Sequence, residues 1–363
     1  MKSQNAKILL TAILGLIIGI MLCRSCLCPN TKEVDGWSVE EALKMKSKKG
    51  GEVYNWNELK ERFKNSDFGA LDHGHHNHNR PDAHAPIGVM GDHLHHKGGL
   101  MVSIRYMDMT MDGNMNGTST VNDEVIYDDF MVAPQHMDMQ MYMLGVMYAP
   151  SDRLTVMAMQ NYVENSMDLT AQMMMGGMKM KRDFSTNSKG LGDLRFGALY
   201  GLLTDDRKSL HLNSLINLPV GSIEERDNTP MQDDVKLPYR MQLGSGTFDY
   251  SFGATFKQNF KTGSIGTQVI GTLRTGENSE GYRFGNQLQL NVWGAYVLSP
   301  NISISGRLQV VTEGKIEGND KELNPKMITT ANTANYGGEG IRSFVGVNVS
   351  FSEASILNRF RLG

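Results

Sequence analysis

Ten segments of the chain alternate apolar and polar residues with a period of two, and this pattern limits the fold more than any other feature. In the segment at 301–312, for example, Ile, Leu and Val mostly take one set of alternate positions, while Ser, Arg and Gln take the other. Strands of a membrane barrel show this pattern because one face meets lipid and the other meets the lumen. The ten segments lie at about 100–109, 138–149, 153–163, 191–203, 208–218, 246–260, 264–274, 281–298, 301–312 and 341–351.

We therefore predict an all-β fold, a transmembrane antiparallel β-barrel of about 10 strands (range 8–12) over residues 99–351. The connections between the segments alternate in length. Short ones lie at 149–153, 204–208, 259–263 and 298–301, and long ones at 110–137, 164–190, 219–245 and 313–340, with 275–280 as a brief exception. Outer-membrane barrels have short periplasmic turns and long outer loops. The alternation predicts an outer-membrane location with the N and C termini in the periplasm.

Residues 1–28 have the layout of an export signal. Lys2 and Lys7 flank the start of an apolar run at 8–22 that is shorter than a normal membrane span. An uncleaved anchor is the alternative. Three nearby cysteines permit a thiolate metal site, one acylated cysteine or a local disulfide in an oxidising compartment. They are Cys23, Cys26 and Cys28.

Residues 73–98 contain eight of the ten histidines. The preceding stretch, 29–72, is polar and helix-forming, and we expect a small periplasmic module or linker there, with a C-terminal tail at 352–363. The histidine segment has no apolar periodicity, so we expect a loop on the periplasmic side or a plug in the lumen. Neutral imidazoles bind Cu(II), Zn(II) and Ni(II). The candidate metal ligands are His73, His75, His76, His78, His84, His93, His95 and His96.

Methionine is concentrated in residues 90–180, which hold 20 of the 26 methionines. If Tyr142 and Leu144 face lipid, the alternate methionines of that strand face the lumen, and the two neighbouring segments follow the same rule. Thioethers are soft, uncharged ligands that suit Cu(I) and, by the same logic, Ag(I). A series of weak sites permits both entry and release. The candidate ligands are Met101, Met107, Met109, Met137, Met139, Met141, Met143, Met147, Met157 and Met159, with His136 beside them.

Two other interpretations of these methionines stay open. Methionine is also a flexible apolar filler, and a low-polarity lumen would suit hydrophobic molecules. A slip of one residue in register would turn the same side chains to lipid. His211 lies on the polar face of its segment, where ordinary hydrogen bonding is the expectation.

Three stretches carry a resemblance to a known family: HAPIGVMGDHLHHKGGLMVSIRYMDMTMDGNMNGT, KGLGDLRFGALYGLL and LNSLINLPVGS. They resemble the outer-membrane transporter family named for the meta-pathway of phenol degradation, over about residues 84–351. The resemblance implies a barrel that passes small molecules. The many Met and His residues depart from the general family pattern and look more like metal-associated relatives.

A net charge of −3 gives no support for nucleic-acid binding, and no phosphate-loop, nucleotide or zinc-protease motif supports an enzyme. The leading hypothesis is an outer-membrane barrel that binds and transports Cu(I) or Ag(I) along lumen methionines, with a periplasmic histidine cluster. The alternatives are a passive channel for small hydrophobic or aromatic compounds and a non-conducting, metal-sequestering barrel. We expect no obligatory cofactor, copper or silver as the bound ion, and three kinds of partner: outer-membrane lipid, the barrel-assembly machinery and periplasmic copper-handling proteins.

Overall fold

The computed structural model describes residues 80–205, 207–350 and 361–362. The expected export signal, the helical module, most of the C-terminal tail and the candidate ligands His73, His75, His76 and His78 lie outside these residues. Within the described ranges, no helix is long and apolar enough to cross a membrane.

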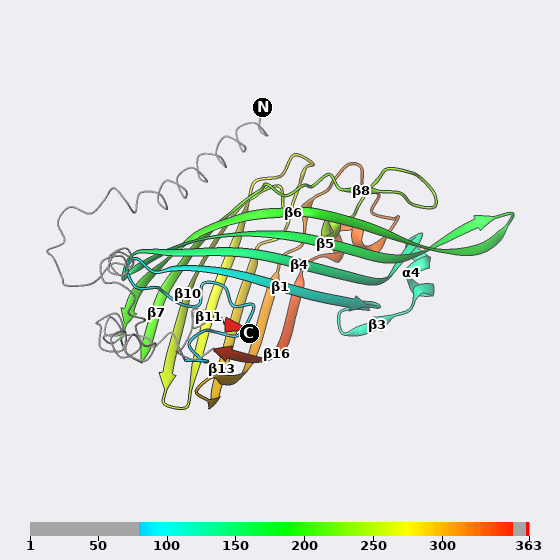
Figure 1. The fold of residues 1–363 in the computed structure, drawn as a ribbon. Helices are drawn as coiled ribbons and strands as arrows, with labels where there is room; N and C mark the ends of the chain where they lie inside the picture. The colour runs from blue at the N-terminus through cyan, green and yellow to red at the C-terminus, as the bar shows by residue number, and fades with distance from the viewer. Residues whose placement is uncertain (1–79, 206, 351–360, 363) are drawn as a thin grey trace, which may run out of the picture. The chain divides into compact units, whose positions relative to one another are not determined.

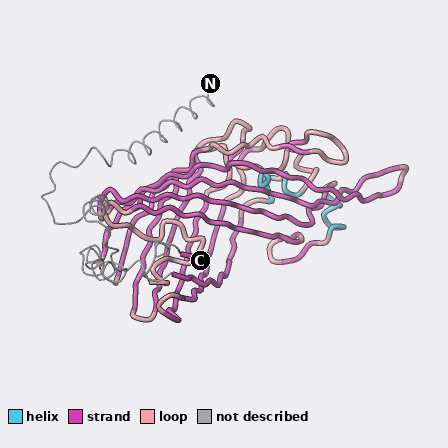
Figure 2. The backbone as a smooth tube through the Cα atoms, viewed as in Figure 1, coloured by secondary structure: helices cyan, strands magenta, loops and turns pink. Residues whose placement is uncertain are grey.

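One curled antiparallel sheet dominates the fold, and each long strand pairs with the next long strand along the chain (Figures 1 and 2). The predicted all-β class and the ten long strands are confirmed. The short β17 (Arg361–Leu362) adds to the edge of the sheet, beside β16. The long strands are β1 (Leu100–Asp112), β4 (Val132–Ser151), β5 (Leu154–Met175), β6 (Met178–Thr204), β7 (Lys208–Leu218), β10 (Phe248–Phe260), β11 (Gly263–Thr275), β13 (Gln287–Ser299), β14 (Ile302–Glu313) and β16 (Gly338–Ser350).

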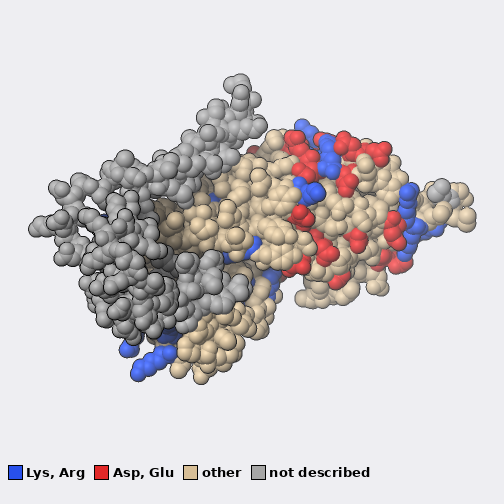
Figure 3. Space-filling model, in the orientation of Figure 1, with Lys and Arg blue, Asp and Glu red and all other residues tan. Residues whose placement is uncertain are grey.

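The two faces of this sheet differ as the period-two pattern predicts. In β14, Ile302 and Ile304 are exposed on the convex face, whereas Ser303 and Ser305 are buried on the concave face. This alternation follows from the pleat, which points successive side chains to opposite faces. Figure 3 shows few charged side chains over the middle of the visible face, while Asp, Glu, Lys and Arg gather at the end that carries the long connections.

The prediction of a long loop at 164–190 is wrong. β5 and β6 instead continue to a two-residue turn, pairing from Leu154↔Tyr200 to Met175↔Met178. Gly176 and Gly177 form the turn with φ of 59° and 81°, and two positive φ values are what a tight hairpin turn of this kind requires. The hairpin projects beyond the neighbouring strands (Figure 1). Many polar residues are typical of a loop, but they also suit a strand pair that extends beyond its neighbours and is exposed on both faces.

The other long connections contain short ordered elements. β2 (Asn114–Asn116) pairs with β3 (Ser119–Val121), and α4 (Asp123–Asp129) follows them. In the later connections, β8 (Arg226–Asp227) pairs with β9 (Val235–Lys236), and β12 (Tyr282–Arg283) pairs with β15 (Glu317–Gly318). Three short 3₁₀ helices complete them: η2 (Tyr239–Met241), η3 (Thr329–Ala331) and η4 (Thr333–Asn335).

The segment predicted at 281–298 is also corrected. Its long strand, β13, begins only at Gln287. The alternation of the segment would place Tyr282 and Phe284 on its apolar face toward lipid, but both are instead buried with Tyr239 and Ile316. The period-two spacing continues through Tyr282 and Phe284, because the short β12–β15 pair outside the main sheet also alternates its side chains. These aromatic residues form the core of the long connections.

Candidate functional site

Residues 80–99 cross the concave face of the sheet and are held there by polar side chains. The carbonyl oxygen of Gly91 accepts hydrogen bonds from His211 Nε2 at 2.9 Å and from Asn213 Nδ2 at 2.8 Å. The carbonyl oxygen of Met90 accepts a hydrogen bond from Gln268 Nε2 at 2.9 Å. His211 therefore has the ordinary hydrogen-bonding role expected for it. The segment, called the plug below, occupies the lumen side of the sheet.

The first residues of the plug are held by later strands. Ser303 Oγ donates to the carbonyl oxygen of Pro81 at 2.9 Å. Lys257 Nζ and Ser264 Oγ donate to the carbonyl oxygen of Asp82 at 3.1 and 3.0 Å. Buried main-chain carbonyls need such donors in place of water. The polar face of β7, β10, β11 and β14 thus supplies the donors that an irregular segment requires.

The plug brings three of the predicted histidines together, with two of them, His84 and His93, beside the Asp92 carboxylate. His84 Nδ1 lies 3.1 Å from His93 Nδ1, and His93 Nε2 lies 3.2 Å from His95 Nε2. Asp92 Oδ1 is 2.8 Å from His93 Nδ1. Burial lowers the pKa of the His93 ring to about 4, against the attraction of the Asp92 carboxylate. Neutral His93 is consequently the form present near pH 7.

Two other candidate histidines lie apart from this cluster. His96 is exposed near Asp152, with 3.8 Å between His96 Nδ1 and the carboxylate. His136 lies in β4 near the long connections, with its Nδ1 2.6 Å from Asp112 and its Nε2 3.1 Å from Asp138. Within the described part of the chain, the candidate histidines therefore lie in three separate places: the cluster in the plug, His96 and His136.

The methionines of β1, β4 and β5 have the predicted register. Met101 pairs with Met147, and Met147 pairs with Met157, so these three share one face across three strands. Met147 and Met157 are buried, while Leu144 on the opposite face is exposed. A slip of one residue would have exchanged the faces. The methionine face therefore points inward.

Most of these methionines belong to two separate packed clusters, whereas Met107 and Met109, predicted to line the lumen, are exposed. Near the plug, buried methionines pack with Leu199 and Leu215, and Leu94 of the plug packs against them. The methionines of this first cluster are Met90, Met101, Met143, Met147, Met157 and Met159. Toward the long connections, a second cluster contains Met137, Met139, Met167, Met241 and Met327. In both clusters the thioethers have aliphatic neighbours, which is the packing role of methionine.

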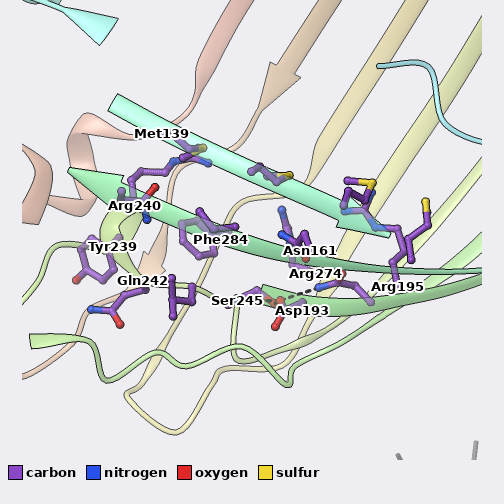
Figure 4. Close-up of a pocket in the computed structure, with 18 residues that line it drawn as sticks. Met139, Asn161, Asp193, Arg195, Tyr239, Arg240, Gln242, Ser245, Arg274 and Phe284 are labelled. Atoms are coloured by element: carbon purple, nitrogen blue, oxygen red, sulfur yellow. Dashed lines mark hydrogen bonds between the residues drawn. The ribbon is translucent and has the colours of Figure 1, made fainter. Parts of the chain in front are cut away.

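A cavity of about 380 Å³ lies between the two clusters (Figure 4). Four thioethers line one side of it: Met139, Met141, Met143 and Met159. Side chains of β6, β7 and β11 contribute Asp193, Arg195, Asn217 and Arg274, and the long connections contribute Tyr239, Arg240 and Phe284. Met107 and Met109 are not among the residues that line the cavity.

Neighbouring groups hold Asp193 of the polar wall and the nearby Asp249. Asp193 accepts hydrogen bonds from Asn217 Nδ2 at 2.8 Å and from the backbone N–H of Ser245 at 2.8 Å. Arg274 forms an ion pair with the buried Asp249. The Arg274 Nε donor is buried and forms no hydrogen bond within the described residues. The Arg274 guanidinium thus lies at the cavity wall and is paired with Asp249.

The long connections line one part of the cavity and are held together by a buried ion pair. Lys236 Nζ lies 2.7 Å from Glu280 and 2.8 Å from Asp320. The backbone N–H of Asp320 donates to Tyr239 Oη at 3.1 Å. Tyr239 in turn packs edge-on against Tyr282, with 4.7 Å between the ring centroids. Sequence reasoning did not single out Lys236, Tyr239, Glu280 or Asp320, because they come from connections whose pairing is not local.

Asp193 and Arg195 are the exception, since they fall within the GLGDLRFG stretch that carries the family resemblance. The family model described as "Putative MetA-pathway of phenol degradation" matches residues 113–324. Comparison with curated proteins gives no match.

Two solved structures are similar to this chain. One is an outer membrane channel from Pseudomonas putida F1, with 14% identity and a TM-score of 0.49, over 73% of this chain and 87% of the channel. The other is a FadL homologue from Pseudomonas aeruginosa, with 12% identity and a TM-score of 0.35, over 70% of this chain and 64% of the homologue.

Proposed function

This chain belongs to the phenol-degradation family whose model it matches over residues 113–324, and on that premise we propose that it is a passive outer-membrane channel for small apolar and aromatic molecules. The exposed apolar side chains of the sheet support a membrane location, since their contact with lipid is favourable and their contact with water is not. As parts of the same proposal, both termini are periplasmic, outer-membrane lipid surrounds the sheet, and the barrel-assembly machinery inserts it.

The cavity between the two methionine clusters is the observation that carries this proposal. One of its walls is made of thioethers, which adapt their shape and make favourable contacts with aromatic rings of about 0.3–1.5 kcal/mol each. Phe284 adds an aromatic surface, and the Arg274 guanidinium adds a polar group to the opposite wall. An apolar pocket with a few placed polar groups is the usual form of a small-molecule site. A molecule with one aromatic ring and one hydroxyl group matches both walls.

The transport of Cu(I) or Ag(I) along the methionines stays a prediction, as do transfer to copper-handling proteins and sequestration without conduction. Four thioethers around one cavity are soft ligands in a suitable place. The same thioethers also suit an apolar guest, and the buried methionines outside the cavity, such as Met147 and Met157, pack against leucines and other aliphatic groups. The family premise favours the aromatic guest.

The experiment that separates these two functions uses a variant with conserved volume. We replace all four cavity methionines with leucine in one chain (Met139→Leu, Met141→Leu, Met143→Leu and Met159→Leu), because leucine retains apolar contact but removes the sulfur ligand. Uptake of radiolabelled phenol and of Ag(I) is measured in bacteria that carry the wild-type chain, the variant or neither.

A phenol channel predicts faster phenol uptake with the wild-type chain than without it, and retention of most of that uptake in the leucine variant. A silver pathway predicts that the variant loses Ag(I) uptake. If the chain does not accelerate phenol uptake, the proposed function is wrong. A second variant, Arg274→Met, removes the guanidinium from the cavity wall and is expected to slow the uptake of phenol more than that of toluene, which has no hydroxyl group.

A further inference from the structure

Three side chains of the plug point their ligand atoms at one another. The atoms come from His84, Asp92 and His93, and all three lie within 4.8 Å of one another. His84 Nδ1 is 3.1 Å from His93 Nδ1 and 3.7 Å from Asp92 Oδ2, and Asp92 Oδ1 is 2.8 Å from His93 Nδ1. Ligands held at about 2.0–2.2 Å in a tetrahedron are roughly 3.4 Å apart. The observed spacings bracket that value.

The neighbours of His93 favour one of its two tautomers. Its Nε2 lies 3.2 Å from His95 Nε2, so a proton on His93 Nε2 can be donated to the neighbouring ring. That tautomer directs the Nδ1 lone pair toward His84 and Asp92. A metal-binding histidine commonly donates its other ring N–H to an acceptor in this way. His95 is therefore placed as a positioning residue for His93.

The carboxylate is positioned as well. The backbone N–H of Ala85 donates to Asp92 Oδ2 at 2.7 Å. This bond joins the two ends of the plug loop and turns the other oxygen, Oδ1, toward His93. Asp92 and His93 are buried, whereas the His84 side chain is 24% exposed, which leaves a route by which an ion can enter.

We propose that His84, Asp92 and His93 bind a divalent transition-metal cation of the Zn(II) or Cu(II) class, and that this ion fastens the plug loop at 84–93. Two imidazoles and one carboxylate suit these borderline cations. They are poor partners for Cu(I), which prefers sulfur, and the nitrogen ligands disfavour Ca²⁺ and Mg²⁺. The site is independent of the proposed channel function.

The position of the loop gives the ion a structural consequence. Between the ligands, Val89 is buried against Trp293, and Gly91 is held by the wall of the sheet. An ion that joins His84 to Asp92 and His93 closes the two ends of this loop. Its closure lowers the number of conformations that a released loop can adopt. Metal binding therefore stabilises the seated plug.

A cluster that only forms hydrogen bonds is the competing explanation. One proton on His93 Nδ1 can bridge to Asp92 or to His84, and these bonds alone would also hold the loop ends together. The two explanations differ in metal affinity. A hydrogen-bonded cluster predicts that replacing His84 leaves metal binding unchanged, because any ion would bind the histidines upstream.

The test uses the full-length chain in detergent, with His73, His75, His76 and His78 replaced by alanine to remove those upstream ligands. Zn(II) affinity is measured by competition with a chromophoric chelator, and the visible spectrum of the Co(II)-loaded chain reports the coordination. We expect one tight Zn(II) site and tetrahedral Co(II) bands. His84→Ala should weaken Zn(II) by more than about a hundredfold, and His95→Ala by about ten- to a hundredfold through the orientation of His93.

His96→Ala is the matched control, because His96 lies in the same segment but outside the cluster. The Zn(II) affinity of this variant should equal that of the background chain. Asp92→Asn provides a second ligand variant if His84→Ala does not fold, and it should also lose the tight site. Hydrogen exchange of residues 84–93 should slow when Zn(II) is added to the background chain. The proposal is overturned if the background chain has no tight site, or if folded His84→Ala and Asp92→Asn both retain it.

Discussion

His211 donates a hydrogen bond of 2.9 Å to the carbonyl oxygen of Gly91, although 120 positions separate the two residues. Asn213, two residues further along the same strand face, donates to the same oxygen. A buried carbonyl can accept two hydrogen bonds, and both donors here come from the wall. The plug is thus held by specific side chains as well as by apolar packing.

Loss of both donors should loosen the plug. In the His211→Ala, Asn213→Ala chain, the Gly91 carbonyl loses two hydrogen bonds of about 1 kcal/mol each. We expect faster hydrogen exchange in residues 84–98 and a higher conductance in planar bilayers than for the wild-type chain. His136→Ala, which removes a histidine far from the plug, is the control. Unchanged exchange and conductance would show that these donors do not hold the plug.

Gly91 should tolerate a side chain less well than Gly98. Both have positive φ, 61° and 81°, so alanine costs about 1–2 kcal/mol of backbone strain at either position. A Cβ at Gly91 would also lie 3.0 Å from Asn213 Nδ2 and from Leu199 Cδ2, whereas a Cβ at Gly98 meets nothing within 4 Å. Local opening measured by hydrogen exchange should therefore be easier in Gly91→Ala than in Gly98→Ala. Equal effects would contradict the tight fit.

Lys236 should hold together the long connections that line the cavity. Lys236→Met leaves the buried Asp320 without its cation, and breaking such a pair costs about 3–5 kcal/mol. The exposed pair of Arg283 with Glu317 is the matched control, because Arg283→Met should cost at most about 1 kcal/mol. Limited proteolysis in detergent should cut the connections at 219–247 and 314–337 faster in Lys236→Met only. Similar rates in both variants would argue against a fastening role.

The two faces of β13 should respond differently to a charge. Leu290 lies on the exposed apolar face, and Leu290→Arg would place a guanidinium in lipid at a cost of about 2–4 kcal/mol near the bilayer midplane. Gln289 lies on the concave face, so Gln289→Arg keeps its charge on the polar side. Folding into liposomes, followed by the electrophoretic shift on heating, should fail or slow for Leu290→Arg alone. Equal folding would mean that this face does not meet lipid.

The strands were predictable because each one alternates locally. Ile302 and Ser303 lie on opposite faces for reasons contained in a few residues, and the inward register of Met147 follows from the same count. The extension of β5 and β6 was not predictable in this way. Residues near Gly176 alternate without an apolar face to bury, so a solvated hairpin and a loop have similar sequences.

The site was harder to predict than the strands. The sequence places histidines in the plug, but the meeting of His84 with His93 depends on how the loop between them folds. The cavity depends on residues such as Tyr239, Arg274 and Met159, which lie on distant strands and connections. Their approach is set by the curl of the sheet and by pairings between connections, and no local pattern encodes either of them.

The hydrogen bonds of the plug also have an order in time. The carbonyl groups of Pro81 and Asp82 are held by Lys257, Ser264 and Ser303, which lie on strands far along the chain from the plug. The plug therefore cannot be seated while the early strands are forming, and its carbonyls must stay solvated until β14 is in place. Closure of the lumen is accordingly a late event in the life of each newly made chain, after most of its wall has been built.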